Sequence, residues 1–343
     1  MRILITGNLG YIGQVLSTFL NKNLPKAILV GIDNNYFYSH NIIKNNNKII
    51  QIYDDIRKIK KDFLKQFDCV VHLAAISNDP IGEKFKEVTR EINYFYTKKL
   101  FKNCLKANVK NFIFASSCSL YGNANPSKFV DENFPQKPLS EYAKSKVNFE
   151  KLLKKNKDKI KITSLRFSTA CGFSPALRLD LVLNEFVFTA INNKKIILKS
   201  SGTSHRPFVH VEDMSRAILW AIERKSKTAQ FVNIGHNKNN YTILELAKIV
   251  QNKIKGTKII LNPNSKQDPR SYKVSFNLYN KVKLKYRPKF MIGKIIDDLK
   301  KNIINHGITT KFIKQKSNLV RLKELICLYK KNKVDRRLNW TNI

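Results

Sequence analysis

The feature that most constrains this chain is a glycine-rich turn between a short apolar run and a helical pattern at the N-terminus. Arg2–Thr6 is aliphatic and β-branched, which predicts a buried parallel strand. Gly7, Gly10 and Gly13 follow, and apolar residues then recur with helical spacing from position 15 to position 20. Such glycines let the backbone turn tightly and approach a pyrophosphate, whose charge the N-terminus of the helix stabilises. The pattern therefore predicts a dinucleotide site.

A carboxylate after the next apolar run indicates which dinucleotide binds. Residues 27–32 predict a second strand, and Asp33 follows it, about twenty residues after Gly13. A carboxylate there accepts hydrogen bonds from the adenosine ribose and repels a 2′-phosphate, and no arginine follows immediately. NAD is therefore predicted in preference to NADP. Tyr11 and Ile12, inside the glycine turn, are expected to contact the same cofactor.

Two further segments are expected to line the cofactor site. Asp55 and Ile56 follow a third apolar run, where the carboxylate can meet the adenine amino group; the alternative interpretation of Asp55 is a plain turn residue. A fourth apolar run leads into Leu73, Ala74 and Ala75, whose small side chains permit close passage of the cofactor. Together these βαβ patterns predict an α/β fold with a doubly wound parallel sheet, the Rossmann domain.

A second group of residues suits catalysis. The run over residues 112–115 predicts a buried strand, and Ser117 lies at its carboxyl end, the edge that faces the ligand in doubly wound sheets. Tyr142 and Lys146 are four residues apart and share one face of a predicted helix. The ammonium group and a nicotinamide cation both favour the phenolate, which would make Tyr142 a general base. Such a pair alone more often lies on an amphipathic helix surface, but its place after the glycine turn favours catalysis.

These motifs, in this order, resemble the extended short-chain dehydrogenase/reductases, and within them the NAD-dependent epimerase/dehydratase family that acts on nucleotide sugars. The resemblance covers roughly residues 1–300. It rests on Gly7-x-x-Gly10-x-x-Gly13, Asp33, Asp55-Ile56-Arg57, His72-Leu73-Ala74-Ala75, Asn93, Ser116-Ser117, Tyr142-x-x-x-Lys146 and Arg166. The resemblance implies that Ser117, Tyr142 and Lys146 form the catalytic triad. It also implies that Asn93 supports the active-site strands.

The resemblance assigns substrate contacts to the second half of the chain. Family members usually carry asparagine three residues after the position of Arg166, whereas this chain has Thr169 there, which puts that contact in doubt. Asn184 is a polar candidate for the sugar or diphosphate, with a solvated helix residue as an equal alternative. Arg206 stands in a family segment whose arginine grips the nucleotide diphosphate. Arg270 lies near the place of a displaced family arginine and is expected to substitute for it.

The expected organisation is two interleaved domains. Residues 1–175 form the NAD-binding domain, and residues 206–236 return to its sheet. Residues 176–205 and 237–343 form a smaller substrate-binding domain that ends in a basic, helix-like tail with no assigned role. The apolar faces of the helices expected over residues 93–105 and 142–153 resemble those that pair as a four-helix bundle in the family, so a homodimer is expected.

Composition limits the other partners. The net charge is +39, from 64 lysines and arginines against 25 acidic residues, which suits anionic substrates in general. These cations are spread along the chain beside many asparagines and accompany no nucleic-acid motif, so no specific nucleic-acid partner is expected. The five cysteines are scattered without a C-x-x-C pair, which favours reduced thiols in the cytoplasm and no metal site. No apolar run reaches the roughly 18 residues of a membrane span.

Three reactions and one non-catalytic role compete as the function of this site. An epimerase needs hydride removal, rotation of the ketone and hydride return, all of which the triad serves with NAD. A 4,6-dehydratase also needs an acid and a base, which family members place directly after the catalytic hydroxyl residue; this chain has Cys118 and Ser119 there, and neither supplies a carboxyl group. A nucleotide-sugar dehydrogenase/reductase is the second alternative. A non-catalytic NAD-binding regulator would be expected to lose the Tyr142–Lys146 pair. We therefore predict an epimerase of nucleotide-diphosphate sugars.

Overall fold

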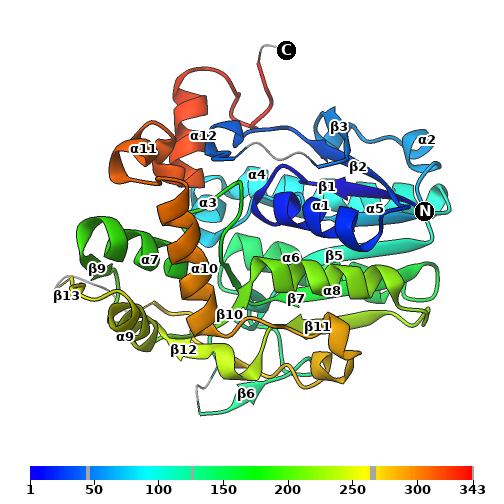
Figure 1. The fold of residues 1–343 in the computed structure, drawn as a ribbon. Coiled ribbons are helices and arrows are strands. Elements are labelled where there is room, and N and C mark those ends of the chain that lie inside the picture. Colours follow the sequence, from blue (N-terminus) through cyan, green and yellow to red (C-terminus); the bar gives the residue numbers. More distant parts are fainter. Residues whose placement is uncertain (44–46, 125–126, 263–267, 342–343) are drawn as a thin grey trace.

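The computed structural model describes residues 1–43, 47–124, 127–262 and 268–341 (Figure 1). Within these ranges a seven-stranded sheet has the order β11-β7-β5-β4-β1-β2-β3, and all its neighbouring strands are parallel. The strands are β1 (Arg2–Thr6), β2 (Ile28–Asp33), β3 (Ile50–Tyr53), β4 (Cys69–His72), β5 (Asn111–Ser117), β7 (Lys161–Phe167) and β11 (Gln230–Ile234). The strand order reverses between β1 and β4, where doubly wound sheets bind their ligands. The predicted fold class is confirmed.

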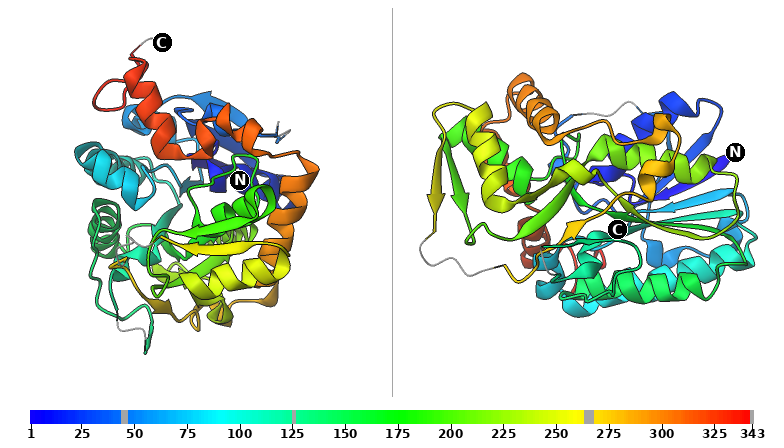
Figure 2. Two further views of the ribbon diagram at one scale, coloured as in Figure 1. Left: turned by 90° about the vertical axis from the view of Figure 1, so that its left-hand side faces the viewer. Right: turned by 90° about the horizontal axis from the view of Figure 1, so that it is seen from below.

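Helices cover both faces of this sheet (Figure 2, right). Helices α1 (Tyr11–Asn23) and α8 (Val211–Glu223) pack together on one face, and α5 (Thr97–Lys106) and α6 (Glu141–Lys154) cover the other. Strand β1 shows why both faces are apolar. Ile3 and Ile5 pack with the α1 and α8 side, whereas Leu4 packs with the α5 and α6 side. Alternate residues of a strand point to opposite faces, so a strand buried on both sides is continuously apolar.

The segment before α5 differs from the expected regular helix over residues 93–105. Residues Glu91–Tyr96 form a π-helical turn, and the α-helix begins only at Thr97. Asn93 lies in this wider turn and is 2% exposed. Its amide accepts a hydrogen bond from the Ile76 nitrogen (2.8 Å) and donates one to the Ile76 carbonyl (2.9 Å). The turn therefore fixes the loop that follows β4, which is the supporting role implied for Asn93.

A smaller lobe lies beyond the carboxyl ends of the strands (Figure 1). Its apolar core joins α7 (Val182–Asn193), α9 (Ile243–Lys253) and α10 (Ile292–Asn305) to the paired strands β9 (Lys195–Leu198) and β13 (Lys258–Leu261). A separate three-stranded sheet consists of β8 (Thr169–Cys171), β10 (His205–His210) and β12 (Asn240–Thr242). Along the chain, these strands occur where the chain passes between the main sheet and the lobe. Short strands β6 (Phe129–Val130) and β14 (Lys273–Val274) also pair. The chain thus crosses between the two parts more than once.

The C-terminal tail packs against the NAD-binding part, whereas the sequence predicted it as part of the substrate-binding domain. After α11 (Thr310–Lys314), helix α12 (Arg321–Lys330) packs Leu325 and Leu328 into the apolar cluster that includes Leu4 of β1. Val334 and Leu338 join the same cluster. The tail therefore belongs to the NAD-binding part, because the apolar face of α12 is covered there. None of the helices in the described ranges has the length and apolar content of a membrane span.

A buried ion pair joins the helix that carries Tyr142 to the sheet. Arg166 of β7 and Glu150 of α6 are both 1% exposed, and Arg166 Nη2 lies 2.8 Å from Glu150 Oε2. Glu150 also accepts a hydrogen bond from Ser164 Oγ (2.9 Å), and Arg166 donates one to the Tyr121 hydroxyl (3.0 Å). Every polar atom of the two side chains has a hydrogen-bond partner, so the pair fixes the position of α6 against β7.

Replacing Glu150 with glutamine is expected to destabilise the protein strongly. Glu150→Gln keeps the side-chain shape but leaves the buried Arg166 charge without a counter-ion, a change that costs about 3–5 kcal/mol. Urea unfolding should show this loss in the free energy of unfolding, while Glu87→Gln, at an exposed position on α4 (Lys86–Arg90), should change it little. Equal small effects for both variants would contradict the role given to the pair.

Candidate active site

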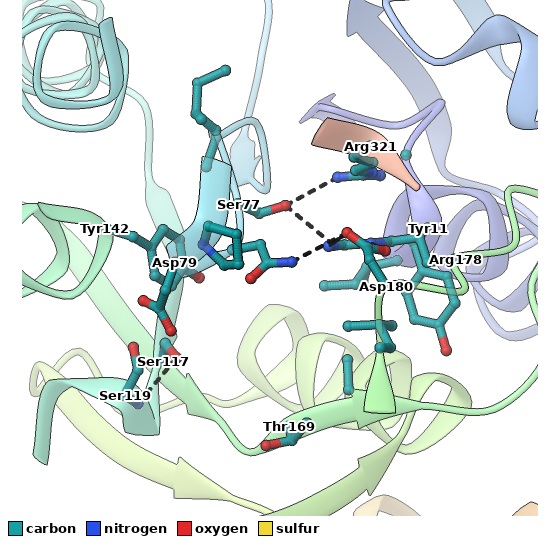
Figure 3. A pocket seen from close by; sticks show the side chains of 18 of the residues that line it. Tyr11, Ser77, Asp79, Ser117, Ser119, Tyr142, Thr169, Arg178, Asp180 and Arg321 are labelled. Atoms are coloured by element: carbon teal, nitrogen blue, oxygen red, sulfur yellow. Dashed lines mark hydrogen bonds and ion pairs between the residues drawn. The ribbon is translucent and has the colours of Figure 1, made fainter. Parts of the chain in front are cut away.

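A cleft of about 900 Å³ lies over the carboxyl ends of β1, β2, β4 and β5. All of the residues predicted to bind the cofactor line it, as do Ser117, Thr169, Arg206 and Arg270. Figure 3 shows two groups of side chains in the cleft. Tyr142, Ser117 and Asp79 lie on one side, and a pair of arginines lies on the other.

The glycine turn forms one end of the cleft. Gly7 has a φ of +78°, in the left-handed region, and its nitrogen donates to the Ile32 carbonyl (2.8 Å). Gly10 stands directly before α1 and has no side chain to occupy the space in front of the helix N-terminus. Asp33, at the end of β2, accepts hydrogen bonds from the Leu9 nitrogen (3.1 Å) and the Asn35 nitrogen (2.8 Å). Its carboxylate is thus fixed beside the glycine turn, and burial raises its pKa above the ordinary value.

Asp55 also lines the cleft, but its carboxylate already has partners. Arg57 binds both its oxygens, at 2.9 and 2.8 Å, and Asn34 donates a third hydrogen bond at 3.2 Å. Asp55 has an extended backbone and stands directly before the short helical turn that contains Ile56. Asp55 therefore has the structural turn role that the sequence left open as an alternative, and an adenine contact would add to that role.

The loop after β4 is fixed by a chain of buried polar groups. Thr6 Oγ1 lies 2.7 Å from His72 Nδ1, and His72 Nε2 lies 3.0 Å from Thr97 Oγ1. Burial, and the positive charge of Lys146, lower the pKa of His72 to about 3, so the ring is neutral. Ala74 donates its N–H to Thr6 Oγ1 (3.3 Å). This network positions the small residues that line the cleft.

The proposed triad meets at the centre of the cleft. Tyr142 and Lys146 lie in the first half of α6, which Ser140 caps by accepting from the Ala143 nitrogen (3.2 Å). Lys146 Nζ donates to the Ala115 carbonyl (2.8 Å) and lies 5.4 Å from the centre of the Tyr142 ring. Ser117 ends β5 on the same side of the cleft as Tyr142 (Figure 3).

The protein's own charges do not produce a phenolate. Burial, together with the negative charge of Asp79, raises the pKa of Tyr142 to about 12, against the lowering effect of the Ser117 hydrogen bond and Arg178. Burial also lowers the pKa of Lys146 to about 7. The spacing of Tyr142 and Lys146 in the sequence predicts that the Lys146 ammonium lowers the pKa of Tyr142. In the folded protein desolvation is larger, because both groups are buried at the base of the cleft.

The predicted substrate arginines, Arg206 and Arg270, come together in the cleft. Arg206 Nη2 lies 2.9 Å from Asp268, and Nη1 donates to the Arg270 carbonyl. Arg270 binds both oxygens of Asp268, at 2.9 and 2.8 Å, and also pairs with Asp79. Thr169 also lines the cleft. Asp268 thus holds both guanidinium groups side by side, and a guanidinium can bind phosphate oxygens in pairs.

Asn184 is not in the cleft, although it was a candidate for the sugar or diphosphate. It is fully buried, accepts a hydrogen bond from the Gly172 nitrogen (3.1 Å) and donates one to the Arg178 carbonyl (3.0 Å). Its amide also reaches the hydroxyl of Tyr11 (3.3 Å), which itself donates to the Gly172 carbonyl (2.6 Å). Its position on the inner face of α7 makes it a support for the turn before that helix.

Arg178, Asp180 and Arg321 are among the charged cleft residues that received no role from the sequence. Arg178 binds both oxygens of Asp180, at 2.9 and 2.8 Å, and both side chains are nearly fully buried. Arg321 comes from α12 and shares Ser77 as a hydrogen-bond partner with Arg178 (Figure 3). Nothing in a sequence with 64 basic residues distinguishes these arginines from the others.

The comparisons with known proteins agree with this geometry. The model of the NAD dependent epimerase/dehydratase family matches residues 3–235, so the chain belongs to that family. Human dTDP-D-glucose 4,6-dehydratase is 26% identical over 264 residues, which cover 75% of each chain. The ADP-L-glycero-D-manno-heptose-6-epimerase of Brachyspira hyodysenteriae is 29% identical over 273 residues, 75% of this chain and 82% of that one.

A solved structure shows the same fold. The UDP-glucuronic acid 4-epimerase of Bacillus cereus, in complex with UDP-glucuronic acid and NAD, superposes with a TM-score of 0.78 at 26% identity. The match covers 89% of this chain and 99% of that one. The predicted family, fold and cofactor are confirmed, and the chain is an NAD-dependent member of a family of epimerases and dehydratases.

The cleft fits NAD. A pyrophosphate would lie at the glycine turn before α1, ribose hydroxyls would meet Asp33, and the nicotinamide end would reach Tyr142 and Lys146. Arg321 also lines this cleft, and its buried Nε has no hydrogen-bond partner among the described residues. These groups match an anionic dinucleotide with free ribose hydroxyls.

Removing the Asp33 carboxylate is expected to narrow the preference for NAD over NADP. Asp33→Ala abolishes both the ribose hydrogen bonds and the repulsion of a 2′-phosphate, so NAD affinity should fall while NADP affinity falls less or rises. Calorimetric titration with both nucleotides measures the ratio. Asp54→Ala, whose carboxylate pairs with Lys58 outside the cleft, is the matched control. Equal or better NADP binding by the unmodified protein would contradict the assignment.

The buried Lys146 is expected to make stability rise with pH. Its pKa is about 7 in the folded protein and near 10.5 when unfolded, so the unfolded chain binds more protons between these values. The penalty for burying the ammonium is complete below pH 7 and is relieved as the pH rises towards 10. The free energy of unfolding of the unmodified protein, relative to Lys146→Met, should therefore increase from pH 7 to pH 9. A constant difference in urea unfolding over that range would show that Lys146 remains charged.

Proposed function

We propose that this protein is an NAD-dependent epimerase of nucleotide-diphosphate sugars, acting through a transient keto sugar. The observation that carries the proposal is a complete Ser117–Tyr142–Lys146 group in a cleft whose carboxylates all have partners. Those partners are backbone N–H groups for Asp33, Arg57 for Asp55, Arg270 for Asp79, Arg178 for Asp180, Lys199 for Glu185, and Arg206 and Arg270 for Asp268. Such a cleft supports proton transfer by tyrosine and binding by arginine.

The chemistry follows from three side chains. Tyr142 takes the proton of a sugar hydroxyl as the carbon beneath it is oxidised, and returns that proton when the carbon is reduced. Ser117 donates a hydrogen bond to the same oxygen and so holds the ketone oxygen in place. Lys146 provides a positive charge that favours the phenolate over the phenol. Bound NAD supplies the hydride acceptor and donor, and its nicotinamide cation also favours the phenolate.

Inversion requires that the hydride return to the opposite face of the ketone. The sugar must therefore turn while the diphosphate stays bound. Arg206 and Arg270 suit this anchoring task, because a guanidinium binds phosphate oxygens in pairs and both line the cleft that contains the triad. The Bacillus cereus epimerase was crystallised with UDP-glucuronic acid, so UDP-sugars are the first substrates to test.

Dehydration is the alternative that some relatives favour, since dTDP-D-glucose 4,6-dehydratases are among them. Two observations support epimerisation instead. Cys118 is 1% exposed, its thiol donates to the Arg166 carbonyl, and burial raises its pKa, so it is no acid or base for the sugar. Asp79 lies beside Tyr142 (Figure 3), but its carboxylate already accepts hydrogen bonds from Arg270 and Ser140. A dehydrogenase/reductase remains the second alternative and is distinguished by its products.

The proposed activity is tested by incubation with UDP-, GDP-, dTDP- and CDP-sugars, with products identified by NMR. We expect an epimeric sugar, no net NADH, and no deuterium on the sugar in D₂O, because the hydride leaves and returns within one turnover. A 4,6-dehydratase would instead incorporate deuterium at C5, where elimination removes a proton. Stoichiometric NADH with an oxidised product would favour the dehydrogenase and contradict the proposal.

The variant Tyr142→Phe is expected to lower turnover by roughly 10²–10⁴-fold while folding and NAD binding persist, since only the proton acceptor is lost. Ser117→Ala should lower turnover less, and Lys146→Met should also weaken NAD binding. Tyr53→Phe, at a position 69% exposed, is the matched control and should change nothing. An unaltered rate for Tyr142→Phe on a confirmed substrate would overturn the catalytic assignment of Tyr142.

A further inference from the structure

The C-terminal helix places one arginine in the cofactor cleft. Arg321 is the first residue of α12 and is only 8% exposed. Its Nη1 donates to Ser77 Oγ (3.0 Å), and its guanidinium lies 4.4 Å from the centre of the Phe37 ring. Its Nε has no hydrogen-bond partner among the described residues. An arginine that is nine-tenths buried and not fully bonded requires an explanation.

The guanidinium of Arg321 lies against the glycine turn. A Cβ atom built on Gly10 would lie 3.2 Å from Arg321 Nη2, so the guanidinium stands directly over that residue. Gly10 is the residue before α1, whose N-terminus carries the positive end of the helix dipole. Two positive features therefore face the same point from two elements that are far apart in the sequence.

The local charges leave Arg321 without a counter-ion. Arg178, which shares Ser77 with it, binds both oxygens of Asp180. No carboxylate in the described ranges forms an ion pair with Arg321, and Asp33 and Asp180 act on it only at longer range. Burial and the repulsion of Arg178 lower the pKa of Arg321 to about 9, so the protein alone makes this charge unfavourable. A bound anion would compensate it.

We propose that Arg321 binds the pyrophosphate of NAD, and that the C-terminal helix thereby completes the site that the glycine turn begins. The match to the family model ends at residue 235, so this contact lies in a part of the chain outside that match. The inference rests on NAD binding alone and not on the proposed epimerase reaction, since no sugar is needed to test it.

The rest of the tail holds Arg321 in place. The carbonyl of Leu338 accepts hydrogen bonds from the Tyr36 hydroxyl and from Arg57 Nη2 (2.8 Å). Trp340 Nε1 donates to the Asn34 carbonyl (2.8 Å). These contacts join the tail to the loops after β2 and β3, beside Asp33 and the adenosine end of the cleft. The guanidinium is therefore positioned before the cofactor binds, which reduces the entropy lost on binding.

The test compares ligands that do and do not contain a pyrophosphate. Arg321→Met should weaken the binding of NAD and of ADP by a similar factor, about 10- to 100-fold, as expected for a charge-assisted hydrogen bond to phosphate. Adenosine, which has no phosphate, should bind as it does to the unmodified protein. Calorimetry measures NAD and ADP with nucleotide-free protein, and ligand-observed NMR measures adenosine. Lys323→Met, which removes an exposed cation from the same helix, should leave all three affinities unchanged.

A structural role for Arg321 gives a different result. Because the buried charge is uncompensated without the cofactor, Arg321→Met should keep or raise the Tm of the nucleotide-free protein and reduce the rise in Tm that NAD causes. If the protein lost stability and adenosine affinity together, or if NAD and ADP bound unchanged, the proposal would be wrong. Arg321→Gln retains donors to Ser77 and should show the same selective loss, which keeps the test valid if the methionine variant does not fold.

Discussion

Close backbone contact around the glycine turn is the constraint on which the rest of the cleft depends. A Cβ on Gly13 would lie 2.4 Å from the Cα of Asn8, and one on Gly7 would lie 2.7 Å from the nitrogen of Ala74. Helix α1, strand β1 and the loop after β4 therefore approach one another to a distance that only glycine permits. This contact sets the position of the helix N-terminus, and β5 brings Ser117 to the same edge of the sheet, where α6 places Tyr142 and Lys146.

Electrostatics then determine what the cleft can hold. The chain is strongly basic, yet each carboxylate that lines the cleft is bound to a cation or to backbone N–H groups. Arg206 and Arg270 are matched by Asp268 and Asp79, and Arg178 by Asp180, so Arg321 is the one cleft arginine in the described ranges without an ion pair. Burial raises the pKa of Tyr142 and lowers that of Lys146, so desolvation opposes the charged form of both candidate catalytic groups.

Several sequence interpretations failed for identifiable physical reasons. Asn184 has a polar side chain in the right region, but the inward face of α7 buries it against Gly172 and Tyr11. The helix around Asn93 begins as a π-helical turn, which an apolar periodicity does not reveal. The tail was assigned by chain order to the substrate-binding part, whereas its apolar face is covered by the NAD-binding part. The homodimer remains a prediction; Phe95, within the first of the two expected interface helices (residues 93–105), is 54% exposed.

The sequence by itself determined the parallel sheet, the glycine turn with its NAD preference, and the Ser117–Tyr142–Lys146 group. These depend on local patterns, because strand runs, glycine spacing and an i to i+4 pair are all short-range. The tertiary structure alone decided the partners of each charge. The pairing of Arg178 with Asp180 and the placement of Arg321 over Gly10 join residues whose types are common throughout this chain. Contacts between distant segments arise from packing of the whole fold, and a single sequence carries no local mark of them.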